Sequence, residues 1–210
     1  MPGSIRVGSL LGIPFHINAS WLVVFGLVTA MLAGDRFPAT YPTWPPALNL
    51  AVALATSLLF FVSIVLHELA HSVVARRLDL PVKSITLFIL GGVAQIGHEG
   101  TRPAAEMAMA AAGPLASFAL AALFGAIWAA FGRTTEPVQA LCAWLTINNL
   151  VLGIFNMLPG FPMDGGRVFR SLLWWATGNH RVATRIAVWF GRGMALTMLG
   201  AGVSIILFSR

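Results

Sequence analysis

The chain has 210 residues, of which 58% are hydrophobic and only 10% are charged. An ordinary soluble domain carries about 25% charged residues, so this composition excludes a soluble fold and indicates an integral membrane protein. The net charge of +6 does not indicate nucleic-acid binding, because the basic residues lie in short loops between apolar segments and form no patch with interleaved aromatic residues. Such charges are typical of the signals that orient a membrane protein.

The N-terminal part of the chain predicts two membrane spans separated by a loop. Residues 1–14 are rich in glycine and indicate an interfacial segment, and the apolar run Phe15–Ala33 follows as the first span. Four prolines in Asp35–Pro46 argue against a continuous helix there. The run Ala47–Ala75 is long enough to be the second span, and it ends at a pair of arginines.

A change of pattern follows the second span. Ser84–Leu90 is β-branched and aromatic, Gly91 and Gly92 interrupt it, and Val93–Ile96 resumes the pattern. Two short runs around a glycine pair predict a β-hairpin or a re-entrant loop. We expect the region Ile85–Ile96 to offer a free strand edge.

The rest of the chain is again apolar, with one irregular stretch. Two prolines and three glycines between residues 156 and 166 must unwind the chain after the fourth span. Gly191-Arg192-Gly193 is expected to interrupt the last apolar segment. The predicted helical segments are Pro103–Phe131, Val138–Met157, Arg167–Ala176 and Val182–Phe208.

Together these patterns predict an α-helical integral membrane protein with about five to six apolar segments. Three transmembrane helices form the core, and a small membrane-associated β-hairpin or β-loop joins the second and third spans. We expect one membrane domain over residues 1–210, with its functional core at about 47–176 and no soluble regulatory domain.

The distribution of positive charges predicts the orientation. If the spans alternate, nine basic residues fall on one side of the membrane and Arg36 and Arg133 fall on the other. The side richer in arginine and lysine is normally cytoplasmic, so we expect a multi-pass protein of the cell membrane with a cytoplasmic N-terminus. The nine residues are Arg6, Arg76, Arg77, Lys83, Arg102, Arg167, Arg170, Arg181 and Arg185.

The second span carries the sequence His67-Glu68-Leu69-Ala70-His71. Residues four apart in a helix lie on one face, so the two imidazoles can share one Zn²⁺. Glu68 lies beside them and can reach a water on the metal, as in the H-E-x-x-H signature of zinc hydrolases. A polar, solvated helix end is the simpler interpretation, but a buried His-Glu-His cluster is costly unless it is paired or binds a metal.

Asp164 is the predicted third zinc ligand. Glu68 and Asp164 are the two carboxylates that we expect deep in apolar surroundings, and Asp164 lies in the unwound stretch, where irregular backbone marks a functional site. A catalytic zinc takes three protein ligands, here His67, His71 and Asp164. Glu68 would then be the general base, and Asn156 either donates a hydrogen bond to the developing oxyanion or is a helix-packing amide.

These motifs carry a resemblance to a known family. His67-Glu68-Leu69-Ala70-His71, together with Asn156-x-x-Pro159-x-x-Pro162-x-Asp164-Gly165-Gly166, resembles the site-2 protease family of intramembrane zinc metalloproteases, peptidase family M50. Gly91-Gly92 and Ala112-Gly113-Pro114 are similar to that family as well. The resemblance implies one Zn²⁺ per chain, held by His67, His71 and Asp164, with Glu68 as the base. It also implies cleavage of a peptide bond within or beside a transmembrane helix of a single-span substrate, held at a strand edge.

Two other functions are compatible with parts of the pattern. A prenyl-protein protease needs a further glutamate ligand on a later helix, but no glutamate follows Glu136. A membrane metal-ion transporter could use the His67, Glu68, His71 and Asp164 cluster as a transit site. A transporter should show a polar path on both sides and often internal repeats, and the sequence shows neither. The sequence does not specify an oligomeric state.

Overall fold

The computed structural model describes residues 4–88, 91–96, 102–131 and 135–208. Within these ranges, five helical segments are long and apolar enough to cross a membrane, which confirms the predicted fold class. The first is the continuous segment Ser20–Thr40, which joins α1 (Ser20–Met31), a π-helical stretch η1 (Leu32–Arg36) and α2 (Phe37–Thr40). The other four are α3 (Pro46–Arg77), α4 (Pro103–Phe131), α5 (Glu136–Asn156) and α7 (His180–Phe208).

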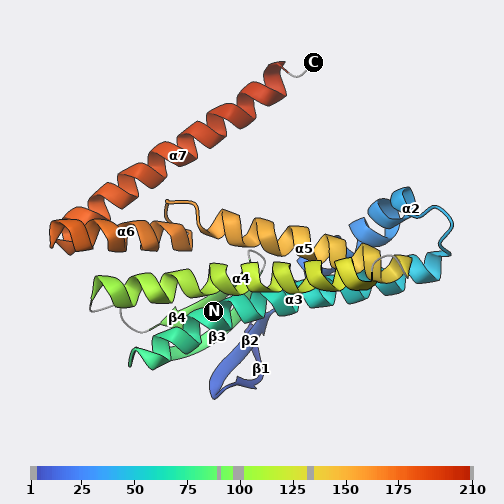
Figure 1. The fold of residues 1–210 in the computed structure, drawn as a ribbon, viewed down its shortest axis with the longest axis horizontal. Helices are drawn as coiled ribbons and strands as arrows, with labels where there is room; N and C mark the ends of the chain where they lie inside the picture. The colour runs from blue at the N-terminus through green and yellow to red at the C-terminus, as the bar shows by residue number, and fades with distance from the viewer. Residues whose placement is uncertain (1–3, 89–90, 97–101, 132–134, 209–210) are drawn as a thin grey trace.

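Three long helices form the body of the molecule. α4 packs along both α3 and α5, and α3 also contacts α5, so the three lie side by side (Figure 1). The shorter amphipathic helix α6 (Asp164–Thr177) packs on α4. α7 packs mainly on α6 and then runs away from the bundle toward the C-terminus (Figure 1). Gly191-Arg192-Gly193 does not interrupt α7, contrary to the expectation from sequence.

A four-stranded sheet lies against the end of α3 that carries the histidines. Its strands are β1 (Ser4–Leu10), β2 (Ile13–Asn18), β3 (Val82–Phe88) and β4 (Gly91–Ile96), in the order β1-β2-β3-β4. β2 and β3 run parallel, with Phe15 opposite Ile85, and the two outer pairs are antiparallel. β3 is therefore a central strand, and β4 is an edge strand.

The N-terminal hairpin corrects the prediction for residues 1–14 and for the start of the first span. Leu11 and Gly12 both have positive φ values, 51° and 78°, and form the two-residue turn between β1 and β2. The Arg76 guanidinium, at the end of α3, donates a hydrogen bond to the Leu11 carbonyl. The turn is thereby tied to the helix, and the first span begins at Ser20 and not at Phe15.

Two further local predictions need correction. No continuous helix spans Asp35–Pro46, as predicted, but the break begins only at Tyr41. Helix continues to Thr40 because Pro38 stands in the first turn of α2, where it follows the π-helical hydrogen bonding of η1. Gly91 and Gly92 do not separate two strands but begin β4, opposite Phe88 and Leu87. The remaining helices begin and end within three residues of the predicted bounds.

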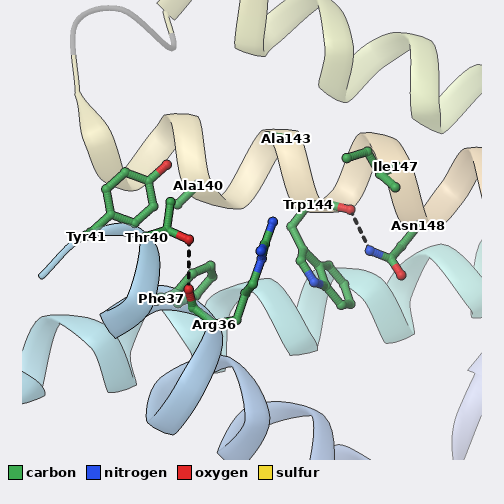
Figure 2. A pocket seen from close by; sticks show the side chains of 9 residues that line it. All are labelled: Arg36, Phe37, Thr40, Tyr41, Ala140, Ala143, Trp144, Ile147 and Asn148. Carbon is green, nitrogen blue, oxygen red and sulfur yellow. Dashed lines mark hydrogen bonds between the residues drawn. The ribbon is translucent and has the colours of Figure 1, made fainter. Parts of the chain in front are cut away.

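A cavity of about 250 Å³ lies at the other end of the bundle (Figure 2). The Arg36 side chain points along it, beside the Trp144 ring. α3 begins nearby at Pro46, and His67 lies about 30 Å further along that helix at 1.5 Å per residue. This cavity is therefore remote from the histidines. It is lined by Arg36, Phe37, Thr40, Tyr41, Ala140, Ala143, Trp144, Ile147 and Asn148.

Candidate metal centre

His67 and His71 project from one face of α3 into the interior of the bundle. Their exposed fractions are 4% and 5%. His71 Nδ1 lies 2.7 Å from the Met109 carbonyl oxygen, and His67 Nδ1 lies 2.9 Å from the Ser117 hydroxyl, both on α4. A carbonyl can only accept, so Nδ1 of His71 carries the hydrogen. Neutral His71 therefore turns the lone pair of Nε2 toward the site, as a metal ligand requires.

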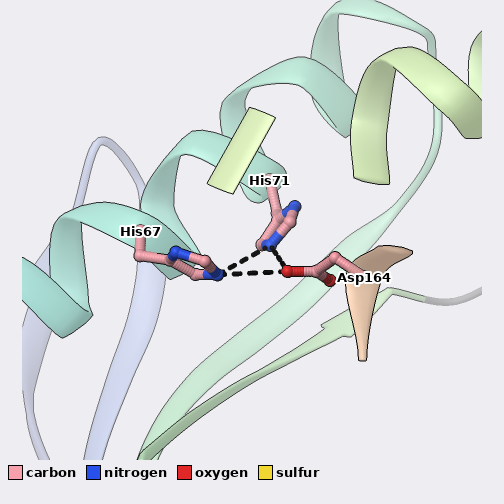
Figure 3. Close-up of side chains that lie close together, drawn as sticks. All are labelled: His67, His71 and Asp164. Atoms are coloured by element: carbon pink, nitrogen blue, oxygen red, sulfur yellow. Dashed lines mark hydrogen bonds and ion pairs between the residues drawn. The ribbon is translucent and has the colours of Figure 1, made fainter. Parts of the chain in front are cut away.

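Asp164 completes the cluster from a different helix. It is the first residue of α6, and its carboxylate points at the two imidazoles (Figure 3). Its Oδ2 atom lies 3.2 Å from His67 Nε2 and 3.1 Å from His71 Nε2. The two Nε2 atoms are 3.2 Å apart. The side chain of Asp164 is 16% exposed and that of His67 only 5%, so the cluster is more open to its surroundings at Asp164 than at His67.

The three donor atoms have the spacing of a zinc site. Zinc is bound tetrahedrally at about 2.0–2.1 Å, which separates neighbouring donors by about 3.3 Å. The observed separations are 3.1–3.2 Å on all three sides of the triangle. His67, His71 and Asp164 also form the one metal-binding cluster of histidine, cysteine, aspartate and glutamate among the residues that the structure describes. The donor set therefore fits zinc.

The charges of the cluster favour a cation at its centre. The carboxylate oxygen Oδ2 of Asp164 and the Nε2 atoms of both histidines lie within 3.2 Å of one another. Two imidazole lone pairs and a carboxylate this close together repel one another unless a proton or a metal ion lies between them.

Gly113 of α4 lies directly against the two imidazoles. A Cβ atom built there would stand 2.6 Å from His67 Nε2 and closer still to His71 Nε2. Glycine is therefore needed for a steric reason, since any side chain at this position would enter the space where the two nitrogens converge. The Ala112-Gly113-Pro114 motif, which resembles the family in sequence, thus contains a residue that lines the cluster.

Glu68 and Asn156 are the two remaining predicted site residues. Glu68 is half-buried and lies beside the edge strand. A Cβ atom built on Gly92 would be 3.2 Å from Glu68 Cδ and 3.3 Å from Glu68 Oε1, so the two residues are in close contact. Asn156 is the last residue of α5, and its amide donates to the Leu152 carbonyl within the same helix. Neither residue belongs to the three-donor cluster, so their catalytic roles stay predictions.

The expectation that Glu68 and Asp164 are the only deep carboxylates is wrong. Glu106, in the first turn of α4, has an exposed fraction of 0% and pairs with Arg170 of α6. Arg170 is itself buried, so it is not a solvated charge that orients the chain.

Comparison with known proteins identifies the family of this chain. Residues 55–135 and 129–200 match the sequence model of peptidase family M50. The chain belongs to this family. The solved structure of the site-2 protease from Methanocaldococcus jannaschii matches this M50 chain with a TM-score of 0.62 and 30% identity, over 97% of this chain and 86% of that one.

Two curated relatives align over nearly the whole of this chain. A protein of Synechocystis, provisionally named a zinc metalloprotease, is 41% identical over 206 residues, which cover 96% of the M50 chain and 52% of that protein. A zinc metalloprotease of Methanocaldococcus jannaschii is 34% identical over 203 residues, covering 95% and 54%. The M50 chain thus spans about half the length of the curated relatives that it matches.

Proposed function

We propose that this chain is an intramembrane zinc metalloendopeptidase, which cuts a peptide bond within or next to a transmembrane helix of a single-span membrane protein. The observation that carries the proposal is the zinc-like triangle of His67, His71 and Asp164, with Glu68 on the same helix. α3 is apolar enough to span a membrane, so the site lies at membrane depth. We propose one zinc ion per chain, because one such cluster occurs within the described ranges.

The proposed roles follow from the positions of the side chains. Zinc in this triad would supply Lewis acidity toward the scissile carbonyl and lower the pKa of water. Glu68 takes a proton from the attacking water and delivers it to the leaving amine as the carbon–nitrogen bond breaks. Asn156 has two amide hydrogens and gives one to Leu152, so the second can donate to the carbonyl oxygen as its charge develops.

A substrate helix must be opened before it can be cut, because a helical carbonyl is enclosed in the backbone ladder. An extended segment can pair with the outer edge of β4, which has β3 on its other side. Gly92 of β4 lies against Glu68, so a strand added there would run about 4.8 Å from β4, near the proposed base. β4 lies within the region Ile85–Ile96 that was expected to offer a free strand edge.

The proposed orientation puts the N-terminus and the active-site end of α3 in the cytoplasm of a cell-membrane protein. Arg76 and Arg77 close α3 at that end, whereas Arg36 lies at the other end of the bundle, and Arg133 falls outside the described residues. Single cysteines at Asp79 and Thr135 should label from the cytoplasmic and the opposite face respectively. Reversed labelling would overturn the orientation.

The deciding experiment compares wild type with Glu68→Gln in lipid vesicles that contain a single-span substrate. Wild type should contain equimolar zinc and cleave the substrate, whereas Glu68→Gln should contain zinc and fail to cleave. A metal-ion transporter that uses the same cluster would instead move zinc into sealed vesicles. Zinc uptake without cleavage would replace the proposal by that alternative.

A further inference from the structure

The ion pair between Glu106 and Arg170 is buried and joins the two helices α4 and α6. Arg170 Nε donates to Glu106 Oε1 at 2.9 Å, and Nη2 of the same guanidinium contacts the same oxygen. The exposed fractions are 0% for Glu106 and 4% for Arg170. Arg167, one turn earlier, is 3.9 Å from the same carboxylate and has 26% of its side chain exposed.

A buried ion pair of this kind contributes more to geometry than to stability. Removing two charges from water is so costly that a well-packed apolar pair is often at least as stable. A guanidinium, however, is rigid and planar, and here two of its nitrogens meet one carboxylate oxygen, which constrains the direction of the pair as well as its distance. The pair is therefore suited to hold α6 in one rotation and one register on α4.

One face of α4 contacts both histidines of the metal centre and the helix that begins with Asp164. Glu106, Met109, Gly113 and Ser117 recur at the three- and four-residue spacing that lies along one side of a helix. Met109 and Ser117 contact the two histidines, and Gly113 lets α4 approach them closely. Glu106 extends the same face to Arg170, on the helix that begins with Asp164.

The position of α6 is critical because Asp164 reaches the site from its first residue. Arg170 lies six residues further along, about 9 Å at 1.5 Å per residue. Its guanidinium also lies 5.3 Å from the ring centre of Phe161, in the irregular segment before α6. Metal sites tolerate deviations of about 0.2 Å in ligand distance, whereas a slip of α6 by one residue is about 1.5 Å.

We propose that Glu106 and Arg170 are positioning residues of the metal centre. Their pair holds α6 against α4 in the register that brings the Asp164 carboxylate to the two imidazoles. This inference rests on the proposed zinc site. It adds that the affinity and geometry of this site depend on an ion pair whose members are not metal ligands.

The test measures metal binding rather than cleavage. Purified apo-protein is titrated with Co²⁺, whose visible absorption reports the coordination geometry, and with Zn²⁺ in competition. Glu106→Gln and Arg170→Gln should each weaken Zn²⁺ binding about 10–100-fold, as loss of an orienting partner does in other metal sites. Both should also reduce the intensity of the tetrahedral Co²⁺ bands. Arg181→Gln, which makes the same change at an exposed arginine of α7, is the control and should leave Zn²⁺ affinity unchanged.

Rescue separates a positioning role from a general loss of structure. The charge-swapped variant, Glu106→Arg with Arg170→Glu, should recover most of the Zn²⁺ affinity and the wild-type Co²⁺ spectrum. Folded single variants with wild-type affinity would overturn the inference. If the single variants do not fold, the swapped variant decides, and its failure to restore the Co²⁺ spectrum would overturn the inference as well. A wild-type protein that binds neither metal would instead refute the proposed function.

Discussion

The substitution Gly113→Ala tests the packing of α4 against the two histidines with a single carbon atom. The new Cβ would lie 2.6 Å from His67 Nε2, whereas ordinary contacts begin at 3.4 Å. His71 Nε2 would be closer still, so both imidazoles, or the whole of α4, must move by more than about 0.8 Å, which is several times the deviation of about 0.2 Å that metal sites tolerate. The alanine carbon would also occupy space between the two nitrogens.

We expect Gly113→Ala to weaken zinc binding at least about 100-fold, which corresponds to about 2.7 kcal/mol. The stability of the helix itself should not decrease, because alanine is up to about 1 kcal/mol more favourable than glycine in a helix interior. The variant should therefore fold with normal helix content and contain little zinc after purification. Competition with a chromophoric chelator measures the affinity directly.

Gly125→Ala is the matched control, since it makes the same change in the same helix. Its Cβ would lie 3.5 Å from Thr146 Cγ2, an ordinary contact, so zinc affinity should stay unchanged. If Gly113→Ala binds zinc as tightly as Gly125→Ala, the two imidazoles do not converge next to α4, and the description of the metal centre is wrong.

Other parts of the site give further expectations. Ser117→Ala removes the hydroxyl that orients His67 and should weaken zinc binding about 10–100-fold in the same competition assay; unchanged affinity would contradict that role. Glu68→Gln should retain zinc and reduce cleavage about 10²–10⁴-fold, and normal turnover would exclude Glu68 as the base. Chelation of zinc should lower the midpoint of thermal unfolding, because saturation at 100 times Kd stabilises by about 2.7 kcal/mol; a midpoint that zinc does not restore would argue against a bound ion.

The features of the site that could be predicted from the sequence depend on local physics. His67, Glu68 and His71 lie within one helical turn, and the periodicity of the helix alone places the two imidazoles on one face. Asp164 was found by its chemistry, because a carboxylate in an irregular apolar stretch needs a cation. The structure brings it to the histidines over 93 residues of sequence separation.

The features that sequence reasoning missed depend on long-range contacts. The parallel pairing of β2 with β3 joins Phe15 to Ile85 across the first span and α3, and no local pattern encodes that partner. The pairing of Glu106 with Arg170 likewise joins residues 64 apart. Arg170 was counted among the charges that orient the chain, Glu106 was not among the carboxylates expected deep in the protein, and only the tertiary fold reveals that both are buried.

The position of β3 inside the sheet changes how a strand edge should be tested. Proline at Ile85 or Leu87 removes an amide hydrogen from a strand that pairs on both sides, and both side chains are buried, with exposed fractions of 0% and 2%. We therefore expect these variants to destabilise the sheet itself. Lost cleavage in them would not identify where a substrate binds.

A proline scan of β4 separates the two effects. Successive residues of an antiparallel edge strand turn their amide hydrogens alternately toward the partner strand and toward the open side. Val93 and Gln95 therefore share one direction, and Ala94 has the other. Proline in the set that faces β3 should lower the midpoint of thermal unfolding, whereas proline in the open-side set should lower cleavage with zinc content and unfolding midpoint unchanged. If all three variants behave alike, or if none affects cleavage, the substrate does not pair with β4 and must be held by another part of the protein.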